Sequence, residues 1–249
     1  MISKNLIKDI KALHQPKFRQ MYNKFIAEGD KVCSELIKNS KYNIDKIFIL
    51  DSTIQQYKDI LSLKGLEFHA VSIKEMAQIT AFKTASDILM LLDKKEDPDN
   101  IMLNINSSAI YMDGIQDPGN VGTIIRLADW FGIDAVIRSE ESADFFNPKV
   151  IQATMGSTVN VSLITADYTK LLAYKKTLVG TFMNGSDISE TAIPPNAILV
   201  LGNEGKGISG ELAEKINHRI SIIGSETRIA ESLNVSIAAG IICHKWKSK

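Results

Sequence analysis

Residues 197–209 read AILVLGNEGKGIS. The first five residues are apolar and typical of a buried strand, and a glycine-rich loop follows them directly. In open α/β sheets, ligands bind at the carboxyl ends of the strands, where such loops lie. The loop matches neither G-x-x-x-x-G-K-[ST] nor G-x-G-x-x-G, so an NTP or dinucleotide site is poorly supported. So many glycines still indicate that the backbone approaches a ligand closely.

The chain around this stretch alternates between short β-rich runs and helical patterns. The strands expected between residues 101 and 249 are 108–112, 134–138, 178–182, 197–201 and 219–223. The helices expected there are 121–131, 147–154, 168–176, 210–217 and 232–246. Continuous apolar strands between helices predict a mostly parallel sheet that is covered on both faces, which is the α/β class.

Residues 1–92 alternate in the same way and are expected to form a smaller α/β domain. Helices are expected at 3–14, 28–39, 53–64 and 74–80, and strands at 46–50, 67–71 and 87–92. Pro16 is expected to end the first helix, because a residue that precedes proline avoids the helical region. The run DKKEDPDN at 93–100 contains no apolar residue. We expect it to be a linker between domains 1–92 and 101–249.

Composition excludes several classes of protein. The chain has 249 residues, of which 45% are hydrophobic and 23% charged, as in ordinary globular proteins. No apolar run is long enough to span a membrane, and the first residues lack the apolar core of a signal peptide. Cys33 and Cys243 form neither a disulfide framework nor a metal-binding spacing, so we expect a cytoplasmic protein without a metal site. Sequence motifs of metalloproteases and serine hydrolases are absent.

Charge is unevenly spread although the formal net charge is zero. Against the single acid Asp9, residues 1–26 carry the basic residues Lys4, Lys8, Lys11, Lys17, Arg19 and Lys24. A local basic face can bind phosphates even on a neutral protein. The alternative interpretation is a solvated helix face.

Two further loops follow expected strands or open expected helices. Residues 113–122, DGIQDPGNVG, lead into a helix that is apolar except for Arg126 in its first two turns. A buried arginine paired with an aspartate is the alternative interpretation of Arg126. Residues 231–236, ESLNVS, open the last helix, where Ser and Asn are ordinary caps. That helix is apolar nearly all round over 235–242, so we expect it to be buried on every side, in part at a subunit interface.

Taken in order, the three loops resemble the motifs of the SpoU (TrmH-like) family of RNA ribose 2′-O-methyltransferases, of the SPOUT class. The loop at 113–122, with Asn120 and Arg126, resembles motif 1; residues 202–209 resemble motif 2, and residues 231–241 resemble motif 3. FIAEG at 25–29, followed by a helix, is similar to the substrate-binding domain that many members carry. The resemblance therefore covers most of the chain.

The resemblance implies a parallel-sheet catalytic domain with a deep trefoil knot and an L30e-like RNA-binding domain at residues 1–92. It implies S-adenosylmethionine as the cofactor and a homodimer packed through the knotted domain. Two segments depart from the family pattern. The stretch that contains residues 223–229 is about two residues longer, and residues 84–92 lack the usual Pro-Gly.

The resemblance also assigns roles to residues. Cofactor contacts, largely through the backbone, are expected from Leu201, Gly202, Asn203, Gly205, Ile222, Ile223 and Leu233. The expected catalytic set is Arg126, Asn120, Glu204, Ser232 and Asn234. Within it, Arg126 holds a neighbouring phosphate or stabilises the developing alkoxide, and Asn120 positions Arg126 or the ribose. Glu204 and Ser232 orient the cofactor or the substrate, Asn234 is mainly structural, and the proton acceptor is open. Contacts to RNA phosphates are expected from Lys8, Lys11, Lys17 and Arg19.

The expected function is methyl transfer from S-adenosylmethionine to a ribose 2′-hydroxyl of RNA, with ribosomal RNA as the expected target. The alternatives are a tRNA 2′-O-methyltransferase, an inactive module that binds RNA and the cofactor, and a methyltransferase for base atoms. An α/β enzyme that uses a nucleotide and no RNA is a further alternative, which the absent phosphate signatures disfavour.

Overall fold

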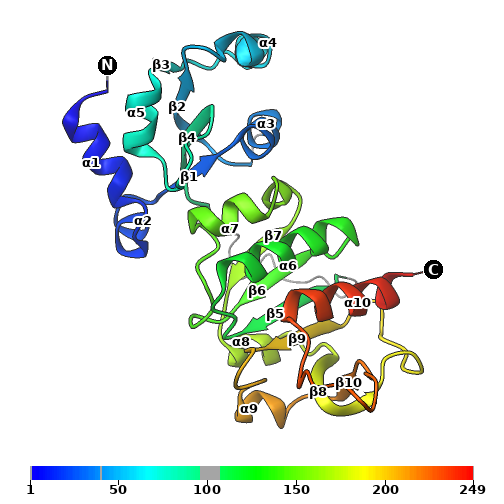
Figure 1. Cartoon of the computed structure of the whole chain (residues 1–249). Helices are drawn as coiled ribbons and strands as arrows, with labels where there is room; N and C mark the ends of the chain where they lie inside the picture. Colours follow the sequence, from blue (N-terminus) through cyan, green and yellow to red (C-terminus); the bar gives the residue numbers. More distant parts are fainter. Residues whose placement is uncertain (1, 40, 96–106, 249) are drawn as a thin grey trace. The chain divides into compact units, whose positions relative to one another are not determined.

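A computed structural model describes residues 2–39, 41–95 and 107–248. The chain divides into two compact units, Met1–Lys95 with Asp144–Val159, and Glu96–Ala143 with Asn160–Lys249 (Figure 1). The expected linker begins at the end of a strand, and its residues 96–100 lie outside the described residues. No linker-like composition marks the segment 144–159 that belongs with the first unit.

The first unit is built on a mixed four-stranded sheet in the order β1-β4-β2-β3. Its elements are α1 (Lys4–Ala12), α2 (Pro16–Tyr22), β1 (Lys24–Glu28), α3 (Asp30–Lys38), β2 (Ile44–Leu50), α4 (Ile54–Lys64), β3 (His69–Val71), α5 (Ile73–Ile79) and β4 (Ile88–Asp93), with α7 (Pro148–Ala153) and the 3₁₀ helix η1 (Ser157–Val159) from the later segment. Strand β4 runs antiparallel to β1 and β2, while β2 and β3 are parallel.

Two hydrophobic layers hold the first unit together. Side chains of α1 and α5, such as Ile10 and Met76, pack with one face of the sheet around Phe48. The segment 144–159 adds Phe146, whose ring centroid lies 4.9 Å from that of Phe25 and 6.2 Å from that of Tyr42. Buried aromatic pairs of this kind contribute packing beyond their area alone.

The second unit is a six-stranded sheet in the order β10-β8-β9-β5-β6-β7, and all its strand pairs are parallel. Its elements are β5 (Ala109–Asp113), α6 (Pro118–Trp130), β6 (Ala135–Arg138), β7 (Ser162–Thr165), α8 (Tyr168–Ala173), β8 (Leu178–Asp187), β9 (Ile198–Gly202), α9 (Gly210–Ala213), β10 (His218–Ser221) and α10 (Val235–Lys247). The predicted parallel α/β sheet is confirmed.

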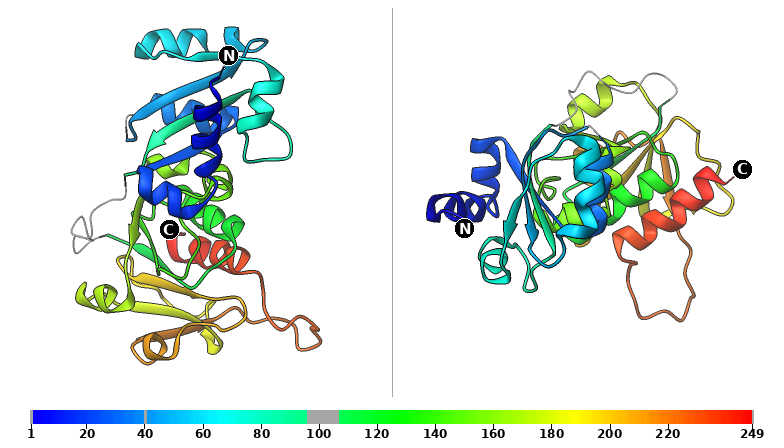
Figure 2. Two further views of the ribbon diagram at one scale, coloured as in Figure 1. Left: turned by 90° about the vertical axis from the view of Figure 1, so that its left-hand side faces the viewer. Right: turned by 90° about the horizontal axis from the view of Figure 1, so that it is seen from above.

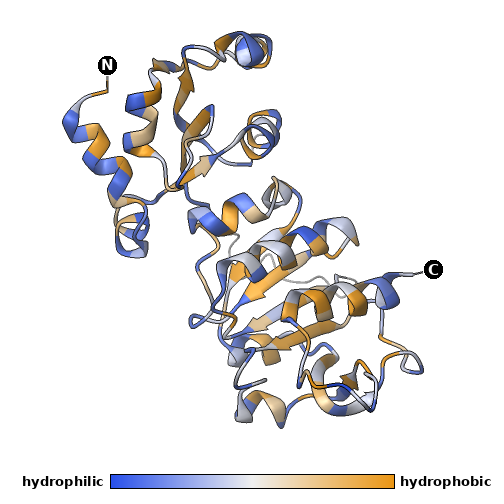
Figure 3. Cartoon of the chain, viewed as in Figure 1, coloured by the Kyte–Doolittle hydropathy of each residue, from blue (hydrophilic) through white to orange (hydrophobic). Residues whose placement is uncertain are grey.

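Helices cover both faces of this sheet, as expected. Leu171 of α8 and Leu212 of α9 pack on the face that carries Tyr111 and Val200. Helices α6 and α10 pack against each other and contact β6 and β9 respectively. The strands are the most continuously hydrophobic part of the unit (Figure 3).

Several elements differ from expectation. Helix α2 and strands β1 and β7 form where no helix or strand was expected. Pro16 does end the first helical stretch, but it also occupies the first turn of α2, where proline is favoured. Within this one chain, helix α10 leaves Ile237 and Ile241 57% and 42% exposed, so its burial on every side depends on the expected subunit interface, which stays a prediction. Within the described residues, no helix has the length and apolar character needed to cross a membrane.

Candidate active site

The first two motif loops begin side by side at the carboxyl edge of the sheet. Asp113, the last residue of β5, pairs in register with Gly202, the last residue of β9. Two hydrogen bonds then tie the loops together. The Asn203 side chain donates to the carbonyl of Gly114 at 2.7 Å, and the backbone N–H of Ser209 donates to the Asp113 carboxylate at 2.6 Å.

The glycine-rich loop closes on itself. Asn203 and Gly207 exchange backbone hydrogen bonds of 3.0 and 2.9 Å, and Asn203 Oδ1 accepts from the N–H groups of Gly205 and Lys206. A Cβ atom at Gly202 would lie 2.3 Å from the carbonyl carbon of Gly207. The turn therefore excludes every side chain at residue 202, which explains the glycine after the strand.

A chain of three side chains joins all three motif loops. Asn120 Nδ2 donates to Glu204 Oε1 at 2.8 Å, and Asn234 Nδ2 donates to Asn120 Oδ1 at 3.0 Å. Asn120 is only 9% exposed, and its backbone N–H is fixed by Asp117, the N-cap of α6. We call Asn120, Glu204 and Asn234 the amide–carboxylate chain. It brings together three of the five expected catalytic residues.

Asn234 has a second role as the N-cap of α10. Its Oδ1 accepts from the backbone N–H groups of Ser236 and Ile237 at 2.9 and 3.3 Å. The predicted capping role is confirmed. Because the same side chain donates to Asn120, the start of α10 is fixed to motif 1. Ser232 lies in the exposed loop before this cap.

Two serines that the sequence analysis missed hold the motif 1 loop from the other side. The N–H groups of Gly114 and Ile115 donate to Ser139 Oγ at 3.0 Å and to Ser142 Oγ at 2.9 Å. Ser142 Oγ also lies 3.0 Å from the carbonyl of Met112, to which it donates. Both serines are 4% exposed. Their position just after a strand at the same sheet edge is the only sequence signal for this role.

A cleft of about 1160 Å³ lies beside this chain of hydrogen bonds. Its walls include six of the seven expected cofactor residues, namely Gly202, Asn203, Gly205, Ile222, Ile223 and Leu233, together with Glu204 and Ser232. Leu201 is the exception, because its side chain is fully buried and does not line the cleft. The 222–234 loop, which contains the longer stretch, extends away from the body of the unit (Figure 2).

The chemistry of the cleft fits S-adenosylmethionine. Its apolar wall includes Ile220 and Val235, and the glycine-rich loop contributes Gly202, Gly205 and Gly207 to its lining. Its charged lining consists of Glu204, Glu226 and Glu231 against Lys206 and Arg228. An acidic surplus suits a cationic sulfonium ligand with an apolar base better than a triphosphate, which needs an excess of donors.

Arg126 is not part of the amide–carboxylate chain. It lies on the exposed side of α6, and within the described residues it makes no hydrogen bond or ion pair. The alternative of a buried arginine paired with an aspartate is therefore wrong. Arg126 shares its helix face with Trp130, four residues later, which is 81% exposed. Its catalytic role stays a prediction.

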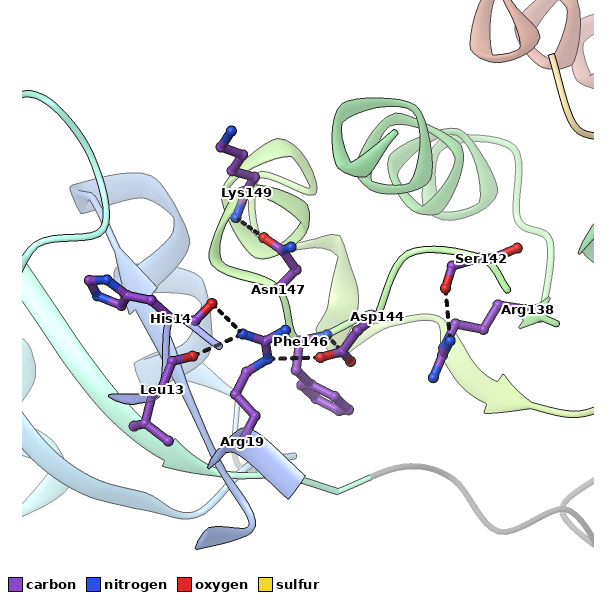
Figure 4. A network of polar contacts seen from close by, with 9 residues as sticks. All are labelled: Leu13, His14, Arg19, Arg138, Ser142, Asp144, Phe146, Asn147 and Lys149. Carbon is purple, nitrogen blue, oxygen red and sulfur yellow. Dashed lines mark hydrogen bonds and ion pairs between the residues drawn. The ribbon is translucent and has the colours of Figure 1, made fainter. Parts of the chain in front are cut away.

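The expected RNA-binding residues divide into two kinds. Lys8, Lys11 and Lys17 are exposed. Arg19 is 1% exposed, with Nε at 2.7 Å from the Asp144 carboxylate and Nη1 donating to the carbonyls of Leu13 and His14 (Figure 4). The expectation that Arg19 contacts RNA is wrong, because its side chain is buried and its Nε and Nη1 donors are used inside the first unit.

Known proteins match most of the chain in sequence. The SpoU rRNA Methylase family matches residues 107–244, and the MRM3-like substrate binding domain matches residues 4–90. The chain is 30% identical over 245 residues to the 23S rRNA (guanosine(2553)-2′-O)-methyltransferase RlmP of Bacillus subtilis, covering 96% of this chain and 94% of that protein.

Solved structures give the same result. A TrmH-family protein from Porphyromonas gingivalis is 33% identical, with a TM-score of 0.85 and coverage of 99% of this chain and 98% of that one. The S-adenosylmethionine-bound rRNA methyltransferase from Sinorhizobium meliloti is 26% identical, with a TM-score of 0.86 and coverage of 98% and 95%. The trefoil knot implied by the resemblance stays a prediction. Because the family match spans more than half of the chain and a full-length relative reaches 30% identity, the protein belongs to the SpoU rRNA methylase family.

Proposed function

We propose that the protein transfers a methyl group from S-adenosylmethionine to a ribose 2′-hydroxyl of ribosomal RNA. The observation that carries the proposal is the amide–carboxylate chain, which joins the three motif loops at the edge of a cleft that fits the cofactor. The relatives named above support ribosomal RNA as the substrate class, because their names state activity on rRNA.

When bound, S-adenosylmethionine supplies an electrophilic methyl group on a sulfonium. The protein's own residues then have to orient the acceptor hydroxyl. Asn120 fixes one oxygen of Glu204, so the exposed Glu204 carboxylate keeps a second oxygen that can accept a hydrogen bond from a ribose hydroxyl. Alignment of the reacting atoms can supply several kcal/mol of barrier reduction.

Arg126 supplies a permanent positive charge near the substrate in this proposal. Its role in this proposal is to hold a phosphate or to stabilise the developing alkoxide. The structure leaves its donors uncommitted within the described residues, which suits an arginine that waits for an RNA ligand.

We further propose a homodimer packed through α6 and α10. Trp130, Ile237 and Ile241 are 81%, 57% and 42% exposed on two helices that pack against each other. A second copy that covers this face would remove large apolar side chains from water. Arg126, on the same face of α6 as Trp130, would then lie at the subunit boundary.

The first unit is proposed to bind RNA, with Lys8, Lys11 and Lys17 as phosphate contacts. Its mixed sheet agrees with the α/β domain expected for residues 1–92, with which the later segment 144–159 packs. We propose a cytoplasmic location, which an rRNA substrate and two free, buried cysteines support.

The test uses tritiated S-adenosylmethionine and total RNA from a strain that lacks the gene. The labelled RNA is separated by size and digested to nucleosides. We expect the label in large ribosomal RNA as a 2′-O-methylnucleoside. Label in tRNA would show that the substrate is tRNA instead of rRNA, and label on a base would show that the enzyme methylates base atoms. Absence of label, with cofactor binding confirmed by calorimetry, would indicate an inactive module that binds RNA and the cofactor.

A further inference from the structure

Helix α2 buries a charged side chain and exposes apolar ones, which is the reverse of an ordinary surface helix. Its buried side chain is the cation Arg19, which is 1% exposed, whereas Met21 and Tyr22 are 70% and 40% exposed. Surface helices usually bury an apolar stripe and leave charges in water. A helix held with its apolar side outward points to a function for that side.

Polar anchors keep α2 in this orientation. Arg19 reaches Asp144 and the carbonyls of Leu13 and His14, which end the previous helix (Figure 4). The end of α2 is closed by Asn23 in the left-handed conformation, with φ at 50° and its N–H donating to the carbonyls of Arg19 and Gln20. The apolar side is therefore presented by a fixed backbone rather than by a loose loop.

The outward side combines aromatic rings with a cation. The rings of Phe18 and Tyr22, four residues apart, have centroids 5.8 Å apart and an interplanar angle of 33°. Lys17 Nζ lies 6.0 Å from the centroid of the Phe18 ring and is exposed. Met21 lies one turn after Lys17 on the same side of the helix. We call Lys17, Phe18, Met21 and Tyr22 the α2 platform.

Single-stranded RNA is the partner whose chemistry matches the platform. Aromatic side chains stack on bases of any sequence, and cations beside them hold the backbone phosphates. Lys8 and Lys11 add exposed positive charge on α1, the preceding helix. Lys8, Lys11 and Lys17 are all exposed, and their positive charge complements an anionic ligand such as RNA.

We propose that the α2 platform stacks an unpaired nucleotide of the RNA substrate while Lys17 holds an adjacent phosphate. This inference rests on the proposed function, and it adds a base-stacking site to a domain for which the sequence indicated only phosphate contacts. Bases within a duplex are already stacked on one another, so the platform selects an unpaired segment.

The test compares Tyr22→Ala and Met21→Ala with Leu63→Ala, which removes an 83% exposed leucine from α4 of the same unit. Affinity is measured by fluorescence anisotropy with a short labelled RNA strand of mixed sequence and with its duplex. We expect Tyr22→Ala to weaken the affinity for the single strand by about fivefold or more and to leave the affinity for the duplex unchanged. Leu63→Ala should change neither affinity. Lys17→Gln should reduce the salt slope by about 0.7, and Tyr22→Ala should not.

Equal single-strand affinity of Tyr22→Ala and Leu63→Ala would overturn the proposal. A change of sedimentation coefficient in Tyr22→Ala, with RNA affinity unchanged, would also overturn it and make the platform a protein interface. Thermal unfolding of each variant shows that the first unit is intact. RNA binding that follows the expected pattern, without any methyl transfer, would support the platform and refute the proposed activity. Methyl transfer with single-strand binding that Tyr22→Ala does not change would support the activity and refute the platform.

Discussion

Replacing Asn120 with aspartate tests the amide–carboxylate chain with almost no change in shape. The substitution turns the donor Nδ2, which lies 2.8 Å from Glu204 Oε1, into an oxygen. Two carboxylates then face each other at hydrogen-bond distance without a proton between them. Asn234 can still donate to the other oxygen of residue 120, so only the bond to Glu204 is lost.

Coulomb's law gives the size of the effect. Two unit charges about 4 Å apart repel by about 4 kcal/mol at an effective dielectric of about 20. Glu204 is exposed, so water screens the pair and reduces the net cost to about 1–2 kcal/mol. That cost corresponds to a loss of about 5–30-fold in methyl transfer if the chain orients the catalytic loops. Because a shared proton removes the repulsion, the loss should shrink as the pH falls.

The assay is the rate of methyl transfer to rRNA between about pH 6 and about pH 8.5, with calorimetric binding of S-adenosylhomocysteine as a check on the cleft. The matched control is the double variant Asn120→Asp with Glu204→Gln, which restores one donor and one acceptor in reversed order. It should recover most of the activity and lose the added pH dependence. A single variant that is as active as the wild type at all pH values, or a double variant that is no better than the single one, would refute the role of the chain.

Three further predictions follow from individual residues. Gly202→Ala places a Cβ 2.3 Å from the backbone of Gly207, so it should lower the free energy of unfolding by about 1–3 kcal/mol and abolish most of the cofactor affinity. The control Gly210→Ala meets nothing within 4 Å and should change neither quantity. Urea unfolding measures the stability of both variants, and calorimetry measures their cofactor affinity. Arg126→Ala should bind S-adenosylhomocysteine normally and lose methyl transfer about a hundredfold; activity within about threefold of the wild type would contradict the assignment. Burial lowers the pKa of His14, so the folded chain binds that proton more weakly than the unfolded chain, and the free energy of unfolding should fall from about pH 7 to about pH 5. Urea midpoints of His14→Leu should lack this component, and an identical pH profile in both proteins would be inconsistent with it.

Strands β5, β6 and β9 of the second unit could be predicted because each is mostly an apolar run between helical patterns. AILVL became β9, and its partner β5 was found in the same way. Strand β7 was missed because Ser162–Thr165 is short and follows a 3₁₀ turn rather than a recognisable helix end. Helix α2 was missed because Pro16 was read only as a stop, although proline equally starts a helix.

The site was predictable where its residues belong to the three motifs and not where residues outside the motifs complete it. Asn120, Glu204 and Asn234 meet as the order of motifs indicated. Arg19 was misassigned because its partner Asp144 is 125 residues away, and no local pattern shows that a charged residue will find a buried ion pair. Ser139 and Ser142 were overlooked for the same reason, since their hydrogen-bond partners, the N–H groups of Gly114 and Ile115, are 25 and 27 residues away in sequence.

The amide–carboxylate chain also determines when in folding the site can appear. Its two hydrogen bonds close sequence separations of 84 and 114 residues, so each requires distant segments of the second unit to come together first. Contacts of such long range form late and slowly, because the closure entropy of the intervening chain is lost first. Recovery of methyl transfer after dilution from denaturant should therefore lag behind recovery of helix content, and enzymatic activity would time the last step of folding.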